Sequence, residues 1–448
     1  MTQMIATSKV KAIIGTGVTG LSVARFLAKQ GQAFVLLDTR AQPPNLAQIK
    51  EEFPQVLVET GELKVETLLL ADEIIASPGV AVATPAIAKA KAAGIPVVGD
   101  IELFVRYARA PIVAITGSNA KSTVTTLVGE MAAQAGLKVA VGGNLGTPAL
   151  DLLRDDIELY VMELSSFQLE TVSRLNARVA TILNISADHL DRYPNMQAYH
   201  AAKLRVYFGA EKIVVNRNDV LTHPPLATGI KPITFGGGAE FNNFGIIQEQ
   251  DEDYLAWQFQ PLMPVSQLKI RGKHNVDNAL AALALGQAAG LPLPAMIETL
   301  KTFAGLPHRC EWVTAIKGVE FFNDSKGTNI GATVAAIKGL ARPPAKLVLI
   351  AGGDGKGAHF AELAPAIDDQ VRAVGLIGRD APVIAAAMVG KSKIIFATSM
   401  TDAVNKSFEH AHAGDAVLLS PACASFDMFK NYIDRGQQFC AAVRELAS

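Results

Sequence analysis

One stretch of the sequence has the residue types of a phosphate-binding loop. It runs Thr116-Gly117-Ser118-Asn119-Ala120-Lys121-Ser122-Thr123. In such a loop, backbone N–H groups and the start of a helix hold phosphates, the lysine reaches the β and γ groups, and the next hydroxyl meets Mg²⁺. The match is imperfect, because Ile115 and Ala120 stand where the pattern has glycines. Taken alone, the stretch leaves phosphate binding and a plain turn equally open.

A second glycine-rich loop lies near the N-terminus. Gly15-Thr16-Gly17-Val18-Thr19-Gly20 follows an apolar run at 12–14 and precedes a helical pattern at 21–29. Asp38 ends the next apolar run, where it can accept hydrogen bonds from a sugar or base. The context predicts a nucleotide diphosphate at this loop, with a ligand-free tight turn as the alternative.

Acidic and imidazole side chains follow two further strand patterns. Glu163 comes after residues 160–162, and His189 comes shortly after 181–183. Ligands of parallel sheets bind at the carboxyl ends of the strands, so both loops should face the crevice of the phosphate loop and hold a divalent metal there. Capping is the alternative role for both. Lys203, by pattern alone, is a surface lysine on a helix.

The last third of the chain contains three polar loops, each after an apolar strand pattern. They are residues 323–329, 352–357 and 420–427. One such loop indicates only a turn between a strand and a helix. Three in one domain can bind an acidic small molecule, and the side chains that favour this are those of Lys326, Lys356 and Ser425.

Short β-branched runs alternate with helical patterns along the chain, which predicts an α/β fold of parallel sheets. The runs are 12–14, 34–37, 112–115, 160–162, 181–183, 212–215, 347–350 and 416–419. Breaks before residues 100 and 306 predict three domains: a Rossmann-like one at 1–99, a central one of the mononucleotide-binding type at 100–305, and a second Rossmann-like one at 306–448. Within the central domain, residues 222–267 lose the helical period, which predicts a hairpin-rich β insertion.

The composition of the chain argues against several classes of function. The 448 residues carry a formal net charge of -1, which argues against nucleic acid as a partner. Cys310, Cys423 and Cys440 are too few and too scattered for a disulfide framework or a zinc site, which favours a reducing compartment. The opening Met1-Thr2-Gln3-Met4 leaves no room for a signal peptide, and no apolar run is long enough to span a bilayer. We therefore expect a cytoplasmic protein without membrane insertion, and a monomer.

With these loops in order, nearly the whole chain resembles the Mur ligases, the amide-forming enzymes of peptidoglycan synthesis. The motifs that carry the resemblance are residues 116–123, 142–144 (Gly-Gly-Asn), 163–169 (Glu-Leu-Ser-Ser-Phe-Gln-Leu), 188–193 (Asp-His-Leu-Asp-Arg-Tyr), Lys203, 272–275 (Gly-Lys-His-Asn), 307–309 (Pro-His-Arg) and 323–326 (Asn-Asp-Ser-Lys). Residues 420–432, the compact first domain and the absence of an Asp-Asn-Pro-Arg motif resemble the members of the family that add D-glutamate.

The resemblance implies three sites. The residues implied for ATP are Gly117, Ser118, Asn119, Ala120, Lys121, Ser122, Thr123, Asn275, Asn278, Arg309, Asp324 and Lys326. Those implied for a UDP-sugar, UDP-N-acetylmuramoyl-L-alanine, are Val18, Thr19, Asp38, Thr39, Arg40, Ser77, Gly79 and Asn144. Those implied for D-glutamate are Thr328, Lys356, Ser425 and Phe426.

The resemblance also implies two Mg²⁺ ions and the catalytic set. Ser122 or Thr123 with Glu163 would hold one ion, and His189 would help to hold the second. Lys203 matches the family's lysine that CO₂ carbamylates, and the carbamate would also ligate the second ion. The residues implied as catalytic are Lys121, Asn144, His189 and Lys203.

The implied reaction has two steps. The L-alanyl carboxylate attacks the γ-phosphate of ATP to form an acyl phosphate, and the amine of D-glutamate then displaces phosphate. Closure of the last domain over the central one should exclude water in between. The sequence departs from the family pattern at Ala120, Gly327 and Tyr432, and Ala120 is strained if that position needs a positive φ.

Other functions stay open at this point. The chain is alternatively another ligase of the Mur or folylpolyglutamate-synthetase type. A nucleotide-dependent oxidoreductase would use the first glycine-rich loop but leave the second without a purpose. A UDP-sugar-binding protein without catalysis would need neither Lys121 nor Lys203.

Overall fold

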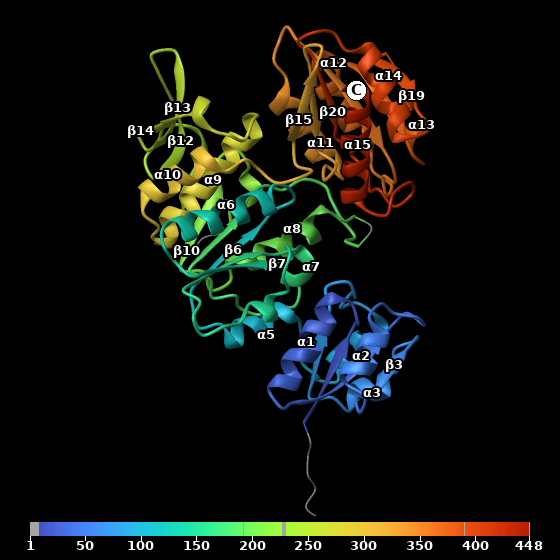
Figure 1. Cartoon of the computed structure of the whole chain (residues 1–448). Coiled ribbons are helices and arrows are strands. Elements are labelled where there is room, and N and C mark those ends of the chain that lie inside the picture. The colour runs from blue at the N-terminus through green and yellow to red at the C-terminus, as the bar shows by residue number, and fades with distance from the viewer. Residues whose placement is uncertain (1–8, 191, 226–229, 389, 448) are drawn as a thin grey trace, which may run out of the picture. The chain divides into compact units, whose positions relative to one another are not determined.

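The computed structural model describes residues 9–190, 192–225, 230–388 and 390–447 (Figure 1). The opening residues Met1 to Met4 and Asp191, used above, lie outside these ranges. The chain divides into two compact units. The first comprises residues 1–185, 195–235 and 282–296, and the second 186–194, 236–281 and 297–448.

The N-terminal sheet is five-stranded, with the order β3-β2-β1-β4-β5. Its strands are β1 (Val10–Ile14), β2 (Ala33–Asp38), β3 (Val58–Thr60), β4 (Glu73–Ala76) and β5 (Val97–Val98). Its helices are α1 (Val18–Lys29), α2 (Leu46–Glu52), α3 (Val65–Leu69) and α4 (Pro85–Ala92). All neighbouring strands are parallel, as the alternating pattern predicts. β1 lies at the centre, so the loop that follows it opens at the carboxyl edge of the sheet.

The central sheet has nine strands in the order β14-β13-β12-β11-β10-β9-β6-β8-β7. They are β6 (Ile112–Thr116), β7 (Val139–Gly143), β8 (Leu159–Glu163), β9 (Val179–Ile182), β10 (Lys212–Asn216), β11 (Ile233–Gly238), β12 (Asn243–Glu249), β13 (Glu252–Trp257) and β14 (Gln260–Pro264). Pairing is parallel from β7 to β11 and antiparallel from β12 to β14. The predicted hairpins are therefore present, and they extend the parallel sheet.

Helices surround the parallel strands. They are α5 (Asp100–Tyr107), α6 (Lys121–Gln134), α7 (Ser166–Leu169), α8 (Met196–Leu204), α9 (Lys273–Ala289) and α10 (Leu293–Thr302), with a 3-10 turn η1 (Ala149–Leu152). Further 3-10 turns are η2 (Arg205–Tyr207), η3 (Val220–Thr222) and η4 (Val265–Gln267). Strand β6 lies between β8 and β9, and its residues 112–115 are fully or almost fully buried. This central, buried strand fixes the position of the phosphate loop.

The C-terminal sheet is six-stranded, with the order β15-β16-β20-β17-β18-β19. Its strands are β15 (Glu311–Ile316), β16 (Val319–Asn323), β17 (Leu347–Gly352), β18 (Val371–Ile377), β19 (Lys393–Phe396) and β20 (Ala416–Leu419). Its helices are α11 (Ile330–Leu340), α12 (Ala364–Gln370), α13 (Ala381–Ala387), α14 (Met400–His410) and α15 (Tyr432–Ala447), with the turn η5 (Phe360–Leu363). Only β15 is antiparallel to its neighbour.

The fold class, three α/β sheets, is as predicted, and each sheet lies within one of the three predicted domain ranges. The predicted apolar runs lie within the observed strands, except that the run 181–183 extends one residue past β9, which ends at Ile182. The domain boundaries themselves stay a prediction. Across the described residues, no helix combines the length and the apolar character that a membrane crossing requires.

Candidate active site

Two of the three glycines in the first glycine-rich loop are required by its geometry. Gly15 adopts φ +95°, which favours glycine. A Cβ on Gly20 would lie 1.8 Å from the Gly15 carbonyl oxygen, so helix α1 approaches the loop too closely for any other residue. A Cβ on Gly17 would meet nothing within 4 Å. The backbone at Gly17 is therefore open to a ligand at the start of α1.

A cavity of about 570 Å³ opens over this loop. Its lining includes every residue that the resemblance implies for the UDP-sugar: Val18, Thr19, Asp38, Thr39, Arg40, Ser77, Gly79 and Asn144. Gln168, to which the sequence analysis gave no role, also lines it. A cavity of this size accommodates a nucleotide-sized ligand.

Asp38 is almost fully buried beneath the cavity. Its carboxylate accepts hydrogen bonds from the Thr16 N–H and hydroxyl, both at 2.8 Å, and from the Arg40 guanidinium at 2.7 and 2.8 Å. Burial by itself would raise the pKa of Asp38, but the bonds from Arg40 and Thr16 hold that pKa well below its usual range. The ionised Asp38 therefore fixes the glycine-rich loop and orients Arg40 at the cavity.

The phosphate loop connects β6 directly to α6. Ala120 caps the helix in the left-handed region at φ +66°, and its methyl side chain accepts no hydrogen bond from the first turn. The N-terminal end of this 14-residue helix therefore presents N–H groups and the positive end of its dipole to the loop, as a phosphate requires. The positive φ makes alanine the strained choice at this position.

Two residues that the sequence analysis missed support this loop. The Asn119 N–H donates to the side-chain oxygen of Asn184 at 2.8 Å. The Ser118 N–H donates to the backbone oxygen of Asn184 at 2.9 Å. Tyr199 contacts the Ser118 hydroxyl through its own hydroxyl at 3.0 Å. Tyr199 lies four residues before Lys203 on α8, and this helical spacing was the available sign that both lie on one face of the helix.

Two lysines meet at the backbone of the phosphate loop. Lys121 Nζ donates to the Gly117 carbonyl at 2.8 Å and to the Ser118 carbonyl at 2.9 Å. Lys203 Nζ donates to the same Gly117 carbonyl at 2.8 Å and lies 4.9 Å from the centre of the Tyr199 ring. Lys203 is only 2% exposed, so the pattern-based prediction of a surface lysine was wrong. The sequence pattern did not reveal this burial, because lysine counts as a polar residue although its long apolar stem can be buried.

Glu163 connects the phosphate loop, through Ser122, to the cavity over the first glycine-rich loop, through Asn144. Its strand pairs with β6, with Glu163 opposite Ile115. One carboxylate oxygen accepts from the Ser122 hydroxyl at 2.6 Å, and the other from the Asn144 amide, also at 2.6 Å. Thr123 is buried at the next position of α6. A buried carboxylate beside a hydroxyl offers the hard oxygen donors that Mg²⁺ prefers.

His189 belongs to the second compact unit. It adopts φ +55°, its backbone N–H donates to Asp188 at 2.9 Å, and Asp188 accepts from the Asn329 amide at 3.2 Å. Across the residues that the structure describes, no three His, Cys, Asp or Glu side chains gather closely enough to hold a metal by themselves.

The other residues implied for ATP lie on helix α9 and at the start of the C-terminal sheet. The Asn278 amide donates to Asn275 at 2.9 Å, and both are buried. Asp324 accepts from the Ser420 hydroxyl at 2.7 Å, and burial raises the pKa of Asp324 to about 6. Lys326 Nζ lies 4.0 Å from the centre of the Tyr432 ring. Arg309 is half-buried one residue before Cys310.

The three C-terminal loops converge at one edge of the sheet. They follow β16, β20 and β17, which are adjacent. The Ala422 N–H donates to Gly327 O at 2.9 Å, and Asp354 exchanges backbone bonds with Ala424 at 2.8 and 3.0 Å. The residues implied for D-glutamate, Thr328, Lys356, Ser425 and Phe426, lie on these three loops.

Arg435 supports these loops from beneath, and sequence reasoning missed it. It is fully buried on α15. Its guanidinium donates to Ser325 O at 2.8 Å and to Cys423 O at 3.1 Å, which joins the first loop to the third. Burial lowers the pKa of Arg435 to about 10. The sequence carried no signal for it, because an arginine on an amphipathic helix usually faces solvent.

We expect the Ala120→Gly variant to have a several-fold lower KM for ATP, because glycine adopts φ +66° without the roughly 1 kcal/mol strain of alanine. Steady-state kinetics at varied ATP would measure it. Ala133→Gly is the matched control, since Ala133 is exposed on the same helix α6, and it should leave the KM unchanged. An unchanged KM in the Ala120 variant would contradict the strain.

Comparisons with known proteins cover most of the chain. Three family models match: the MurD-like N-terminal domain of Mur ligases at residues 9–99, the Mur ligase middle domain at 115–286, and the Mur ligase glutamate ligase domain at 308–423. A UDP-N-acetylmuramoylalanine–D-glutamate ligase of Pseudomonas fluorescens is 58% identical over 446 residues, 99% of this chain and 100% of that protein. The ligase of the same name from Pseudomonas aeruginosa is 55% identical, again over 99% of this chain and 100% of that protein.

Solved structures agree in fold. A pseudomurein peptide ligase type C from Methanothermus fervidus has a TM-score of 0.60 at 19% identity, covering 98% of this chain and 100% of that one. The UDP-N-acetylmuramate-alanine ligase from Thermotoga maritima has a TM-score of 0.58 at 18% identity, covering 98% and 99%. The three family models and the full-length relatives together show that this chain belongs to the Mur ligase family.

Proposed function

We propose that this chain uses ATP to join D-glutamate to UDP-N-acetylmuramoyl-L-alanine in peptidoglycan precursor synthesis. One observation carries the proposal. Asn144 lines the cavity over the first glycine-rich loop and donates to Glu163, which accepts in turn from Ser122 at the start of the phosphate-loop helix. A UDP-sugar in that cavity and the γ-phosphate of ATP at the loop would therefore meet at the same carboxylate.

Lys121 and Asn144 have separate roles in phosphoryl transfer. Lys121, already within hydrogen-bond distance of two loop carbonyls, neutralises charge on the transferring phosphoryl group. Asn144 positions the end of the UDP-sugar that carries the L-alanyl carboxylate. That carboxylate attacks the γ-phosphate, ADP leaves, and the acyl phosphate is then opened by the amine of D-glutamate, which releases phosphate. The proton of the amine passes to solvent or a nearby base.

The residues fit Mg²⁺ at one site. Ser122 and Glu163 offer a hydroxyl and a buried carboxylate 2.6 Å apart, and both are hard oxygen donors. We infer that they hold one Mg²⁺, with Thr123 as the alternative hydroxyl, and that His189 contributes to a second. The ions would supply charge neutralisation on the ATP phosphates.

The second Mg²⁺ requires a chemical change at Lys203. As an ammonium, Lys203 donates to Gly117 O and cannot ligate a cation. It also shares that carbonyl with Lys121, so two positive charges lie on one acceptor. Reaction of the neutral amine with CO₂ forms an N–C bond, releases one proton and leaves a carbamate anion. The carbamate would remove the like-charge contact and provide oxygen ligands.

We therefore expect the kcat in CO₂-depleted buffer to rise several-fold when bicarbonate is added, because the carbamate re-forms on Lys203. Phosphate release with both substrates present would measure this. Lys138→Gln should show the same rise, since Lys138 is exposed on a loop, whereas Lys203→Gln should show none. Equal rates with and without bicarbonate in the unchanged chain would contradict carbamylation.

The C-terminal loops suit the second substrate. Lys356 supplies a positive charge on a loop that is paired with the loop of Ser425. D-Glutamate carries two carboxylates, so a lysine and a hydroxyl at one sheet edge provide the charge and the hydrogen bond that it requires.

The Cys310, Cys423 and Cys440 thiols form no disulfide, which supports our expectation of a reducing, cytoplasmic location.

The experiment that tests the proposal is coupled ADP formation. Sustained ADP formation should require ATP, UDP-N-acetylmuramoyl-L-alanine and D-glutamate together, because without D-glutamate the reaction stops at the acyl phosphate. The product should contain both substrates in one molecule by mass spectrometry. ADP formation without any dependence on D-glutamate would show that the chain is not this ligase.

A further inference from the structure

A fourth loop lies at the same edge of the C-terminal sheet as the three loops proposed for D-glutamate. It comprises residues 378–380 (Gly-Arg-Asp) and follows β18 (Val371–Ile377). Strand β18 is parallel to β17 and paired with it, so this fourth loop opens beside the 352–357 loop. None of the residues implied for D-glutamate lies on the fourth loop, but its contacts reach two of the three loops that carry them.

The lysine proposed to bind D-glutamate has a strained backbone. Lys356 adopts φ +50°, in the left-handed region that side chains with a Cβ rarely adopt. Such a conformation persists only where the surrounding structure enforces it. Because the side chain of Lys356 is exposed, the enforcing contacts must be those of its backbone and of its neighbours in the loop.

Two carboxylates hold the backbone at this lysine. The Lys356 N–H donates to Asp354 Oδ1 at 3.0 Å, and the preceding Gly355 N–H donates to Asp380 Oδ2 at 2.6 Å. The Asp380 N–H donates in return to the Gly353 carbonyl at 3.0 Å. Successive N–H groups of the 352–357 loop are therefore fixed by carboxylates, and one of these carboxylates belongs to the fourth loop.

Arg379 extends this network in two directions. Its guanidinium Nη1 donates to Asp354 Oδ2 at 3.1 Å, so it holds the same carboxylate that accepts from Lys356. Its backbone N–H donates to Asp427 of the 420–427 loop at 2.8 Å. The fourth loop therefore links the loop of the lysine to the loop that follows β20.

We propose that Asp380 and Arg379 are positioning residues for D-glutamate. They hold Lys356 in the backbone conformation from which its ammonium meets a carboxylate of the substrate, and they act through that lysine rather than by contact with the reacting atoms. This role rests on the proposed function, because it concerns the lysine of the proposed amino-acid site. Loss of either side chain weakens D-glutamate binding and leaves ATP binding unaffected.

Steady-state kinetics of Asp380→Ala tests the first residue. The KM for D-glutamate should rise about fivefold or more, because the Gly355 N–H loses its acceptor and the lysine loses part of its support. The KM for ATP should stay unchanged. Asp380→Asn should restore most of the normal KM for D-glutamate, since its amide oxygen can still accept that hydrogen bond.

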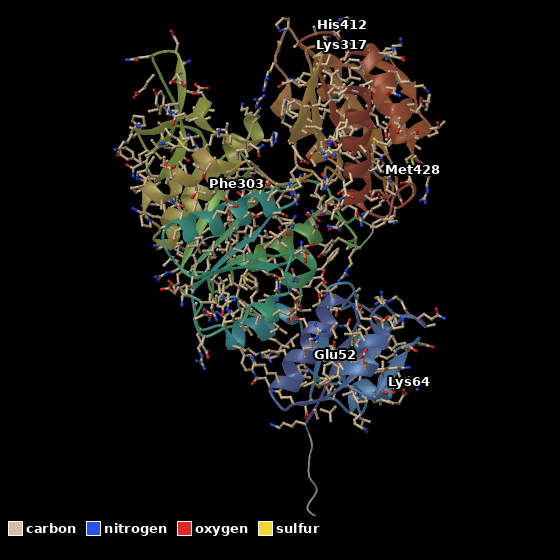
Figure 2. The ribbon with its side chains drawn as sticks, viewed as in Figure 1. Glu52, Lys64, Phe303, Lys317, His412 and Met428 are labelled. Atoms are coloured by element: carbon tan, nitrogen blue, oxygen red, sulfur yellow. The ribbon has the colours of Figure 1, made fainter. Side chains whose placement is uncertain are left out.

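Asp415→Ala is the matched control, because Asp415 also accepts backbone N–H groups in the C-terminal sheet. It accepts from Lys346 at 2.8 Å and from His412 at 2.9 Å. Asp415 directly precedes β20, so it lies at the edge opposite to the substrate loops; Figure 2 labels His412 near that edge and Met428 away from it. Asp415→Ala should lower the unfolding temperature and leave the KM for D-glutamate unchanged.

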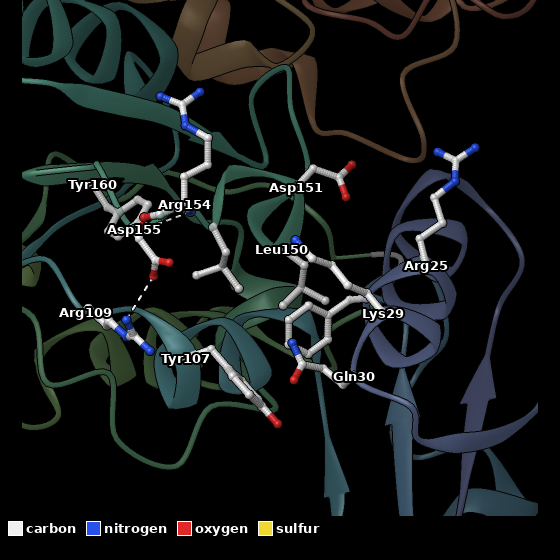
Figure 3. A pocket seen from close by; sticks show the side chains of 12 residues that line it. Arg25, Lys29, Gln30, Tyr107, Arg109, Leu150, Asp151, Arg154, Asp155 and Tyr160 are labelled. Carbon is white, nitrogen blue, oxygen red and sulfur yellow. Dashed lines mark hydrogen bonds and ion pairs between the residues drawn. The ribbon is translucent and has the colours of Figure 1, made fainter.

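Arg379→Gln tests the second residue. Arg379 is exposed, so this variant should fold even where Asp380→Ala does not. The KM for D-glutamate should rise about threefold, and Arg379→Lys should restore it. Arg109→Gln is the control, because it removes an ion pair of the same kind from the first compact unit: Arg109 Nη1 lies 3.0 Å from Asp155, as the dashed line in Figure 3 shows. It should leave that KM unchanged.

Combination with Lys356→Met distinguishes positioning from general weakening. Without the charge of the lysine, Asp380→Ala should add little to the KM for D-glutamate, because both changes act through one ammonium. The positioning role would be overturned by fully additive effects, by equal KM values in Asp380→Ala and Asp415→Ala, or by a normal KM in Asp380→Ala or, where that variant does not fold, in Arg379→Gln. Absence of D-glutamate-dependent turnover in the unchanged chain would instead overturn the proposed function, and the positioning role with it.

Discussion

The Lys121→Met variant is expected to release phosphate from ATP at least about 100-fold more slowly than the unchanged chain, because removal of one preorganised charge from a developing anion typically costs two to three orders of magnitude in kcat. Lys121 Nζ lies 2.8 Å from Gly117 O and 2.9 Å from Ser118 O, at the loop where the transferring group would sit. Methionine keeps the length of the stem but carries no charge.

Lys138→Met is the control for this variant. Lys138 is exposed beyond the end of α6, so the same substitution there removes a charge from the same unit without touching the loop. Phosphate release at saturating ATP, measured for both variants, separates the two positions. A Lys121→Met variant with more than about a tenth of normal kcat would contradict the role given to Lys121.

Arg435→Met is expected to destabilise the C-terminal sheet by about 3 kcal/mol or more, because it leaves several buried carbonyl groups without their donor. The groups concerned are the carbonyls of Ser325, Cys423 and Ala424. Since these residues lie in two of the three loops proposed to bind D-glutamate, the KM for D-glutamate should rise while the KM for ATP changes less.

Arg444→Met is the matched control, because Arg444 is exposed on the same helix α15. Thermal unfolding and the two KM values would be measured for both variants. If Arg435→Met unfolds at the same temperature as Arg444→Met and binds D-glutamate normally, the buried guanidinium does not hold the loops together. Arg435→Lys should recover little, since an ammonium cannot reach carbonyls on both loops.

Much of the fold could be predicted from the sequence, because the strands of parallel sheets are continuous apolar runs. Residues 112–115 are an example: the run Ile-Val-Ala-Ile indicated a strand buried on both faces, and β6 is such a strand. The tight turn of the first loop could also be predicted from its glycines, because the geometry requires glycine at Gly15 and at Gly20. Residues that act through backbone or packing were harder to predict.

The positions and contacts of three side chains could not be predicted from the sequence pattern. Lys203 looked like a surface residue because periodicity does not reveal what a helix face packs against. Asn184 and Arg435 hold loops through contacts 65 and 110 residues away in the chain, which no local pattern can encode. Their roles follow only from the positions of the loops in the folded chain.

Amino-acid selectivity of phosphate release tests the central claim most directly. With ATP and UDP-N-acetylmuramoyl-L-alanine fixed, D-glutamate, L-glutamate, L-alanine and diaminopimelate would be supplied in turn. We predict phosphate release with D-glutamate and little with the other three. L-Alanine lacks the second carboxylate for which Lys356 offers a positive charge, and the preference over L-glutamate and diaminopimelate is the one that the proposed D-glutamate ligase function requires. Faster release with L-alanine or diaminopimelate would contradict the assignment of D-glutamate as the substrate.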